Sequence, residues 1–132
     1  MDNNNKIDAS NNSAGAGQGE PLYDLSMVRA VSGGDEGFIK KMIQLFVETV
    51  PPSLNDLKEA EGQQQWERVG KAAHKLKSTI DSMGITSLKD DIRAVEANGK
   101  HQQNIEAIHA LIQKVDTIVN ACIVQLKADF SL

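Results

Sequence analysis

The stretch WERVGKAAHKLKSTIDSMG, residues 66–84, decides the fold class of this chain. Its apolar residues recur at alternating steps of three and four, which is the period of a helix with one buried face. These positions are Trp66, Val69, Ala73, Leu76, Ile80 and Met83. Gly84 follows the last of them, as expected for a residue that ends a helix. The stretch therefore predicts a helix from about Gln64 to Met83.

The same period continues on both sides of this stretch. It predicts helices over about 35–60, 86–98 and 101–128, and a short leading helix over about 23–31. Pro51 and Pro52 fall inside the first range, where we expect a kink and not a break because the apolar period continues beyond them. Asn98 and Gly99 are expected to stop the fourth helix. Short connections favour an all-α, up-and-down antiparallel four-helix bundle with a short extra N-terminal helix.

Composition narrows the class of protein further. Residues 1–20 are polar and predict a disordered leader or linker, so the bundle is assigned to residues 21–132. A net charge of −4 disfavours nucleic acid or an anionic membrane as a partner.

Cys122 is the single cysteine and lies on an apolar stripe, which indicates a buried thiol in a reducing compartment. No apolar run of membrane-spanning length and no secretion signal are evident, so we expect a cytoplasmic monomer.

The candidate functional residue is His74, one position past the core residue Ala73 and therefore about 100° away from the buried stripe. Its neighbours at steps of three and four are Gly70, Lys71, Lys77 and Ser78. The two small residues leave the ring open to a partner. An exposed imidazole is a nucleophile at neutral pH, and nearby ammonium groups can stabilise a phosphoryl group on it. Lys77 is best placed for this role, with Lys71 and Lys75 in support.

These residues resemble the histidine-containing phosphotransfer domains of multistep two-component signalling. The family signature is a histidine, any residue, an apolar residue, a lysine and a glycine, with a second glycine about ten positions after the histidine. Here it reads His74-Lys75-Leu76-Lys77-Ser78, followed by Gly84. The resemblance covers about residues 22–128. Ser78 departs from the family by replacing the usual glycine.

The resemblance implies a function in a phosphorelay. A phosphoryl group would pass reversibly between Nε2 of His74 and the aspartate of a receiver domain, in a response regulator or a hybrid sensor kinase. The receiver would supply Mg²⁺, and this chain would bind no cofactor and have no ATP-binding or kinase activity of its own. The resemblance also implies a docking surface on the second helix. Met42, Leu45 and Thr49 are assigned to it, and Phe38 is assigned to the core.

Three other classes compete with this interpretation. The dimeric core of a sensor kinase carries an acidic residue after its histidine and a proline soon afterwards, whereas Lys75 follows His74 and the helix has no proline. A di-iron bundle needs two Glu-x-x-His elements, but only Glu106 to His109 fits, so no metal site is expected. A plain helical adaptor that binds a partner through Met42 and Leu45 stays open as the alternative.

Overall fold

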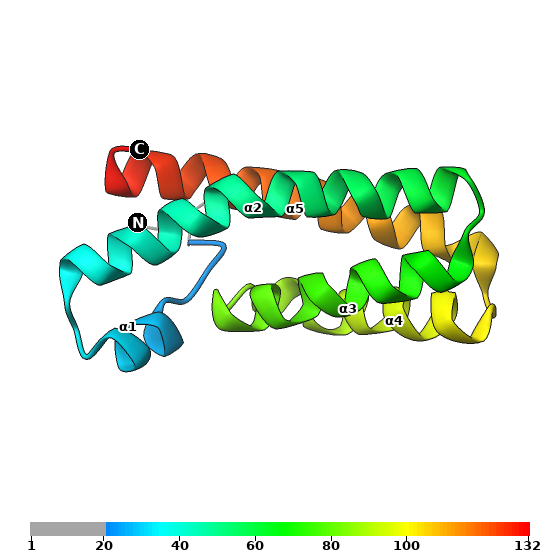
Figure 1. Ribbon diagram of the computed structural model, residues 1–132, viewed down its shortest axis with the longest axis horizontal. Coiled ribbons are helices and arrows are strands. Elements are labelled where there is room, and N and C mark those ends of the chain that lie inside the picture. The colour runs from blue at the N-terminus through cyan, green and yellow to red at the C-terminus, as the bar shows by residue number, and fades with distance from the viewer. Residues whose placement is uncertain (1–20) are drawn as a thin grey trace, which may run out of the picture.

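The computed structural model describes residues 21–132, and every regular element in this range is helical (Figure 1). This confirms the predicted all-α class. The elements are α1 (Ser26–Ser32), α2 (Glu36–Gly62), α3 (Trp66–Ser82), the single 3₁₀ turn η1 (Thr86–Leu88), α4 (Lys89–His101) and α5 (Ile105–Phe130). The predicted boundaries of α2, α3 and α5 agree with these to within a few residues.

The four longer helices lie side by side, and each runs in the opposite direction to the one before it (Figure 1). α3 packs against both α2 and α4, and α5 packs against the same two helices. Each long helix therefore has two neighbours, and the core lies between the four. The short helix α1 lies at one end of the molecule and contacts α2.

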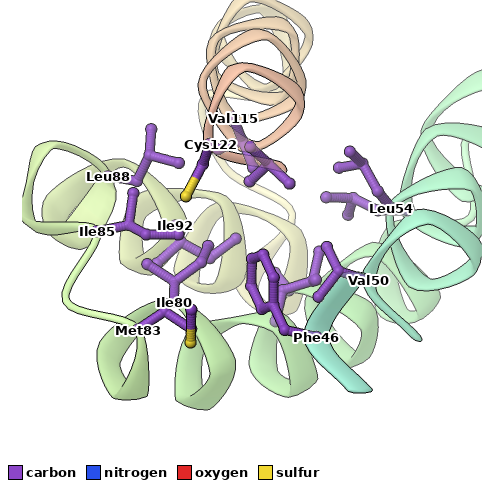
Figure 2. Packing of buried hydrophobic residues seen from close by; sticks show 14 of the residues in the cluster. Phe46, Val50, Leu54, Ile80, Met83, Ile85, Leu88, Ile92, Val115 and Cys122 are labelled. Carbon is purple, nitrogen blue, oxygen red and sulfur yellow. The ribbon is translucent and has the colours of Figure 1, made fainter. Parts of the chain in front are cut away.

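The core is almost entirely aliphatic, and it is formed by the apolar stripes that the sequence predicts. Figure 2 shows Val50 of α2, Ile92 of α4 and Val115 of α5 pointing toward one another. Cys122 is fully buried among these side chains, and its burial raises the pKa of the thiol to about 12. The thiol is therefore a protonated apolar group of the core, which confirms the expectation of a buried thiol.

α2 continues through both of its prolines, as predicted. Pro51 and Pro52 lie within a helix that begins after Asp35 and ends at Gly62. The carboxylate of Asp35 accepts a hydrogen bond from the backbone N–H of Phe38 at 3.2 Å and so caps the first turn. α2 is consequently long enough to extend beside the whole length of α3.

α4 does not end at Asn98 and Gly99, so that prediction is wrong. The helix continues to His101, and both residues are buried inside it. A Cβ atom on Gly99 would lie 2.9 Å from the backbone nitrogen of Gly70 and 3.0 Å from the carbonyl oxygen of Trp66. The glycine therefore serves close packing of α4 on α3. Asn-Gly is a turn signal in an isolated sequence, and packing overrides it here.

Gly84 ends α3, and a second constraint also requires a glycine there. Its φ of +62° belongs to the left-handed region, which side chains disfavour. The backbone of Asp24 also lies against it, and the N–H of Asp24 donates to the carbonyl of Met83 at 3.0 Å. The segment before α1 is thereby fixed to the end of α3.

α5 is long and apolar enough, by length and composition alone, to cross a membrane. By this criterion, the prediction from the sequence that no apolar segment reaches membrane-spanning length is wrong. Seven of its residues are buried in the core, however, and two of its charged residues pair with other helices. Lys114 forms a salt bridge of 2.8 Å with Asp91 of α4, and Asp116 pairs with Lys58 of α2 at 3.2 Å. These contacts are those of a helix packed within a protein.

Candidate functional site

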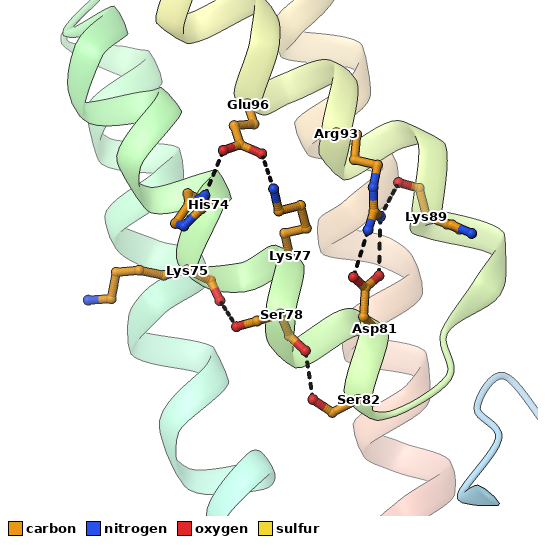
Figure 3. A network of polar contacts seen from close by, with 9 residues as sticks. All are labelled: His74, Lys75, Lys77, Ser78, Asp81, Ser82, Lys89, Arg93 and Glu96. Atoms are coloured by element: carbon orange, nitrogen blue, oxygen red, sulfur yellow. Dashed lines mark hydrogen bonds and ion pairs between the residues drawn. The ribbon is translucent and has the colours of Figure 1, made fainter. Parts of the chain in front are cut away.

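His74 lies near the middle of α3, and 67% of its side chain is exposed. Ala73, immediately before it, is fully buried in the core. The helical period therefore turns the imidazole away from the core, as predicted. Nδ1 of His74 lies 2.7 Å from Oε2 of Glu96 on the neighbouring helix α4 (Figure 3).

Glu96 connects His74 to Lys77. Its second carboxylate oxygen, Oε1, lies 2.8 Å from Nζ of Lys77, so one carboxylate contacts both side chains (Figure 3). The hydrogen bond from Lys77 lowers the pKa of Glu96 below its usual value, and the contact with His74 acts in the same direction. Glu96 is therefore ionised at neutral pH.

The contact with Glu96 determines which ring nitrogen of His74 carries the proton. An ionised carboxylate can only accept hydrogen bonds, so Nδ1 must be the protonated donor. In the neutral ring Nε2 then keeps its lone pair, and it belongs to a side chain that is mostly exposed to solvent. The arrangement provides a nucleophilic nitrogen with a fixed tautomer.

Sequence reasoning missed Glu96, although the sequence holds a signal for it. Glu96 follows the core residue Val95 by one position, as His74 follows Ala73. On two helices packed against each other, side chains that flank the core stripes can meet at the same edge. The signal becomes specific only once α3 and α4 are known to be neighbours.

The three lysines near His74 extend in different directions. Lys77 binds Glu96, whereas Lys71 pairs loosely with Glu67 on the same helix at 3.7 Å. Lys75 lines a shallow depression toward α2, together with residues that include Asp56. Figure 3 shows its ammonium group pointing away from Glu96. Of the three, only Lys77 contacts a partner of the imidazole.

The two small residues that flank His74 occupy different surroundings. Ser78 is exposed one turn after His74, and its hydroxyl donates to the carbonyl of Lys75 at 3.2 Å. Gly70 is buried, and a Cβ there would lie 3.1 Å from the backbone nitrogen of Lys100. The expectation that Gly70 lies on the open face is therefore wrong, because packing against α4 explains its lack of a side chain.

A groove of about 360 Å³ adjoins His74 between α3 and the end of α4. It is lined by Glu67, Gly70, Lys71, His74, Glu96, Lys100 and Gln102. Apart from the glycine, every lining side chain is polar or charged, and the imidazole forms part of the wall. The groove can therefore hold a small polar or charged group beside His74.

The assigned docking residues on α2 differ in exposure. Leu45 is 59% exposed, and Thr49 is also exposed, with its hydroxyl donating to the carbonyl of Leu45 at 2.8 Å. Met42 is half-buried and packs against the core, whereas Phe38 is 45% exposed. The sequence assignment of Phe38 to the core is therefore wrong, and Met42 belongs partly to the core.

A second histidine has a geometry close to that of His74. Nδ1 of His109 on α5 lies 3.0 Å from Oε1 of Glu61 on α2, and its side chain is 62% exposed. His109 thus provides an internal comparison for His74.

Among residues 21–132, no group of three or more histidine, cysteine, aspartate or glutamate side chains is placed to hold a metal ion.

The comparisons with known proteins give one match. The family model described as Hpt domain matches residues 41–121, which is more than half of the 132 residues. The matched range begins in α2 and ends in α5, so it contains both His74 and Glu96. No curated protein and no solved structure matches the chain.

Proposed function

The chain belongs to the Hpt domain family, and from this premise we propose that His74 is the phosphoryl carrier of a phosphorelay. The family implies histidine phosphotransfer between proteins. The observation that carries the assignment to His74 is its contact with Glu96, which leaves Nε2 as a free nucleophile on an exposed side chain. The proposed fold is the family's up-and-down antiparallel four-helix bundle, with α1 as a short extra helix.

Accepting the phosphoryl group requires few groups from this chain. Nε2 of His74 attacks the phosphorus of an aspartyl phosphate on a receiver domain. The N–P bond forms as the P–O bond breaks, and the aspartate leaves with the electron pair. The proton on Nδ1 stays in place, so the ring becomes an imidazolium whose charge faces Glu96 at 2.7 Å. The reverse transfer uses the same groups, so the reaction is reversible.

Positive charge near the imidazole supports this chemistry. A phosphoryl group adds a charge of about −1.5 to −2 at neutral pH. In this proposal Lys77 is the main cation that stabilises it, because it lies one turn from His74 on the same helix. Lys71 and Lys75 add to the local field, which salt in solution screens.

The partner in this proposal is the receiver domain of a response regulator or a hybrid sensor kinase. The receiver supplies Mg²⁺ and its acidic pocket, and this chain contributes no cofactor, ATP-binding site or kinase activity. Leu45, Thr49 and the exposed part of Met42 form the docking surface, while the small side chain of Ser78 admits the partner. The carrier acts as a cytoplasmic monomer and requires neither nucleic acid nor a membrane.

Incubation with a phosphorylated receiver domain tests this function. The wild-type chain should gain phosphate that is labile in acid and stable in alkali, and His74→Gln should gain none. His109→Gln is the matched control, because His109 is similarly exposed and also contacts a glutamate; it should be labelled like the wild type. A wild-type chain that binds the receiver but gains no phosphate would instead be an adaptor.

A further inference from the structure

The charged residues that line the groove beside His74 fall into pairs, with one exception. Glu67 pairs with Lys71, and Glu96 pairs with Lys77 and the imidazole. Lys100 lines the same groove, and no carboxylate within residues 21–132 forms a salt bridge with it. Within the described chain, Lys100 is therefore the one cation of the groove wall whose charge no neighbouring acidic side chain offsets.

The packing of α4 on α3 fixes the position of Lys100. Its backbone lies against Gly70, where a Cβ atom would be 3.1 Å from the nitrogen of Lys100 and 3.4 Å from its Cα. Gly70 precedes His74 by one helical turn. The close contact of the two helices therefore fixes the backbone of Lys100 beside the turn that leads into His74, and its exposed side chain lines the groove.

We propose that Lys100 is a second phosphoryl-binding residue, whose ammonium group contacts the phosphoryl oxygens on Nε2 of His74 inside the groove. This inference rests on the proposed function. The charge of Lys77 is largely compensated by Glu96, and Lys71 is engaged with Glu67. A phosphoryl group of charge about −1.5 to −2 leaves the site short of positive charge unless another cation contributes. Lys100 keeps its proton throughout and acts only through charge and hydrogen bonding.

The lifetime of the phosphohistidine tests this role. The chain is phosphorylated with phosphoramidate, excess donor is removed, and loss of phosphate is followed at neutral pH by ³¹P NMR. Lys100→Gln should shorten the half-life by about three- to fivefold, the size expected for one exposed charge-assisted contact. Lys100→Arg should restore most of the lifetime. Lys114→Gln is the control, because it also removes the charge of a surface lysine, but one that pairs with Asp91 and does not line the groove, and it should leave the lifetime unchanged.

A second measurement avoids substitution altogether. In the wild-type chain labelled with ¹⁵N-lysine, phosphorylation of His74 should shift the side-chain signal of Lys100 and leave that of Lys114 in place. If the signal of Lys100 does not move, or if Lys100→Gln and Lys114→Gln have the same phosphohistidine lifetime, Lys100 does not bind the phosphoryl group. The function assigned to His74 would survive that result, since the wild type would still carry phosphate. A wild type that gains no phosphate would overturn both proposals.

Discussion

Glu96 accepts a hydrogen bond from Nδ1 of His74 at 2.7 Å, although it lies 22 residues further along the chain and on a different helix. The same carboxylate holds Lys77 at 2.8 Å. Glu96 thus orients the ring, selects its tautomer and is placed to balance the charge that the ring would acquire in the proposed phosphorylation. These effects depend on the charge of the carboxylate as well as on its position.

Replacing Glu96 with glutamine should slow phosphoryl transfer from a receiver domain by about tenfold, the effect of losing a hydrogen bond to a charged group. Glutamine keeps the length of the side chain but cannot balance an imidazolium. Glu61→Gln is the control, because it alters the equivalent partner of His109. The measurement is the transfer rate of both variants against the wild type. Equal rates in Glu96→Gln and Glu61→Gln would show that the carboxylate does not assist His74.

Ser78→Gln should obstruct a docking receiver domain without disturbing the imidazole. Ser78 is exposed one turn from His74, and glutamine is a good helix former, so the melting temperature should change little. Transfer from the receiver should fall severalfold, while modification by phosphoramidate should proceed at the wild-type rate. The measured quantity is the ratio of the two rates. Equal slowing with both donors would mean that the substitution acts on His74 itself.

Gly99→Ala should destabilise the fold by about 1–3 kcal/mol, the usual cost of overpacking. The new methyl group would lie 2.9–3.0 Å from backbone atoms of α3, which cannot easily move away. Gly62→Ala is the control, because nothing lies within 4 Å of the position of its Cβ. That variant should be neutral or more stable by about 0.4–1 kcal/mol. Urea unfolding of both variants gives the comparison, and similar stabilities would contradict the close packing of α3 and α4.

Acidification should destabilise the protein, partly through Asp81. Arg93 of α4 contacts its two carboxylate oxygens at 3.1 and 2.7 Å, and this hydrogen bonding lowers the pKa of Asp81 below its usual 3.8. A group whose pKa is lower in the folded state stabilises that state above its unfolded pKa and loses the contribution as pH falls through the folded value. Glu96 acts in the same direction. The melting temperature of Asp81→Asn should therefore fall less steeply than that of the wild type below about pH 4. Parallel slopes would show that this pair contributes nothing.

The sequence predicts the helices and their buried faces well because both follow from a local period. Each apolar position expected in α3 except Trp66 is buried, and Trp66 is half-buried against the core. His74 is exposed for the same reason, since its angle from the stripe is set by the helix itself. Nothing in the sequence reports distances between helices, however. Glu96 was missed for that reason, although it is the side chain that contacts Nδ1 of His74.

The errors concern residues whose environment comes from a neighbouring helix. From the sequence, Gly70 suggested space left for a partner, and Asn98-Gly99 suggested the end of a helix. Small residues and turn-forming residues have these roles when one helix is considered alone. In the folded chain Gly70 and Gly99 face each other across the contact of α3 and α4. Phe38 and Met42 lie one turn apart on the same face of α2, so the period alone did not separate the exposed side chain from the half-buried one.

The close packing of α3 on α4 also has a consequence for the order in which the helices fold. α3 makes its most extensive contact with α4, the next long helix in the chain, and a short connection joins the two. Contacts that are local in sequence form quickly, because closing a short loop costs little chain entropy. We therefore expect the hairpin of residues 66–101 to be among the first parts of the protein to assemble. The imidazole and its carboxylate would then already be paired when α5, the next helix along the chain, docks onto the hairpin.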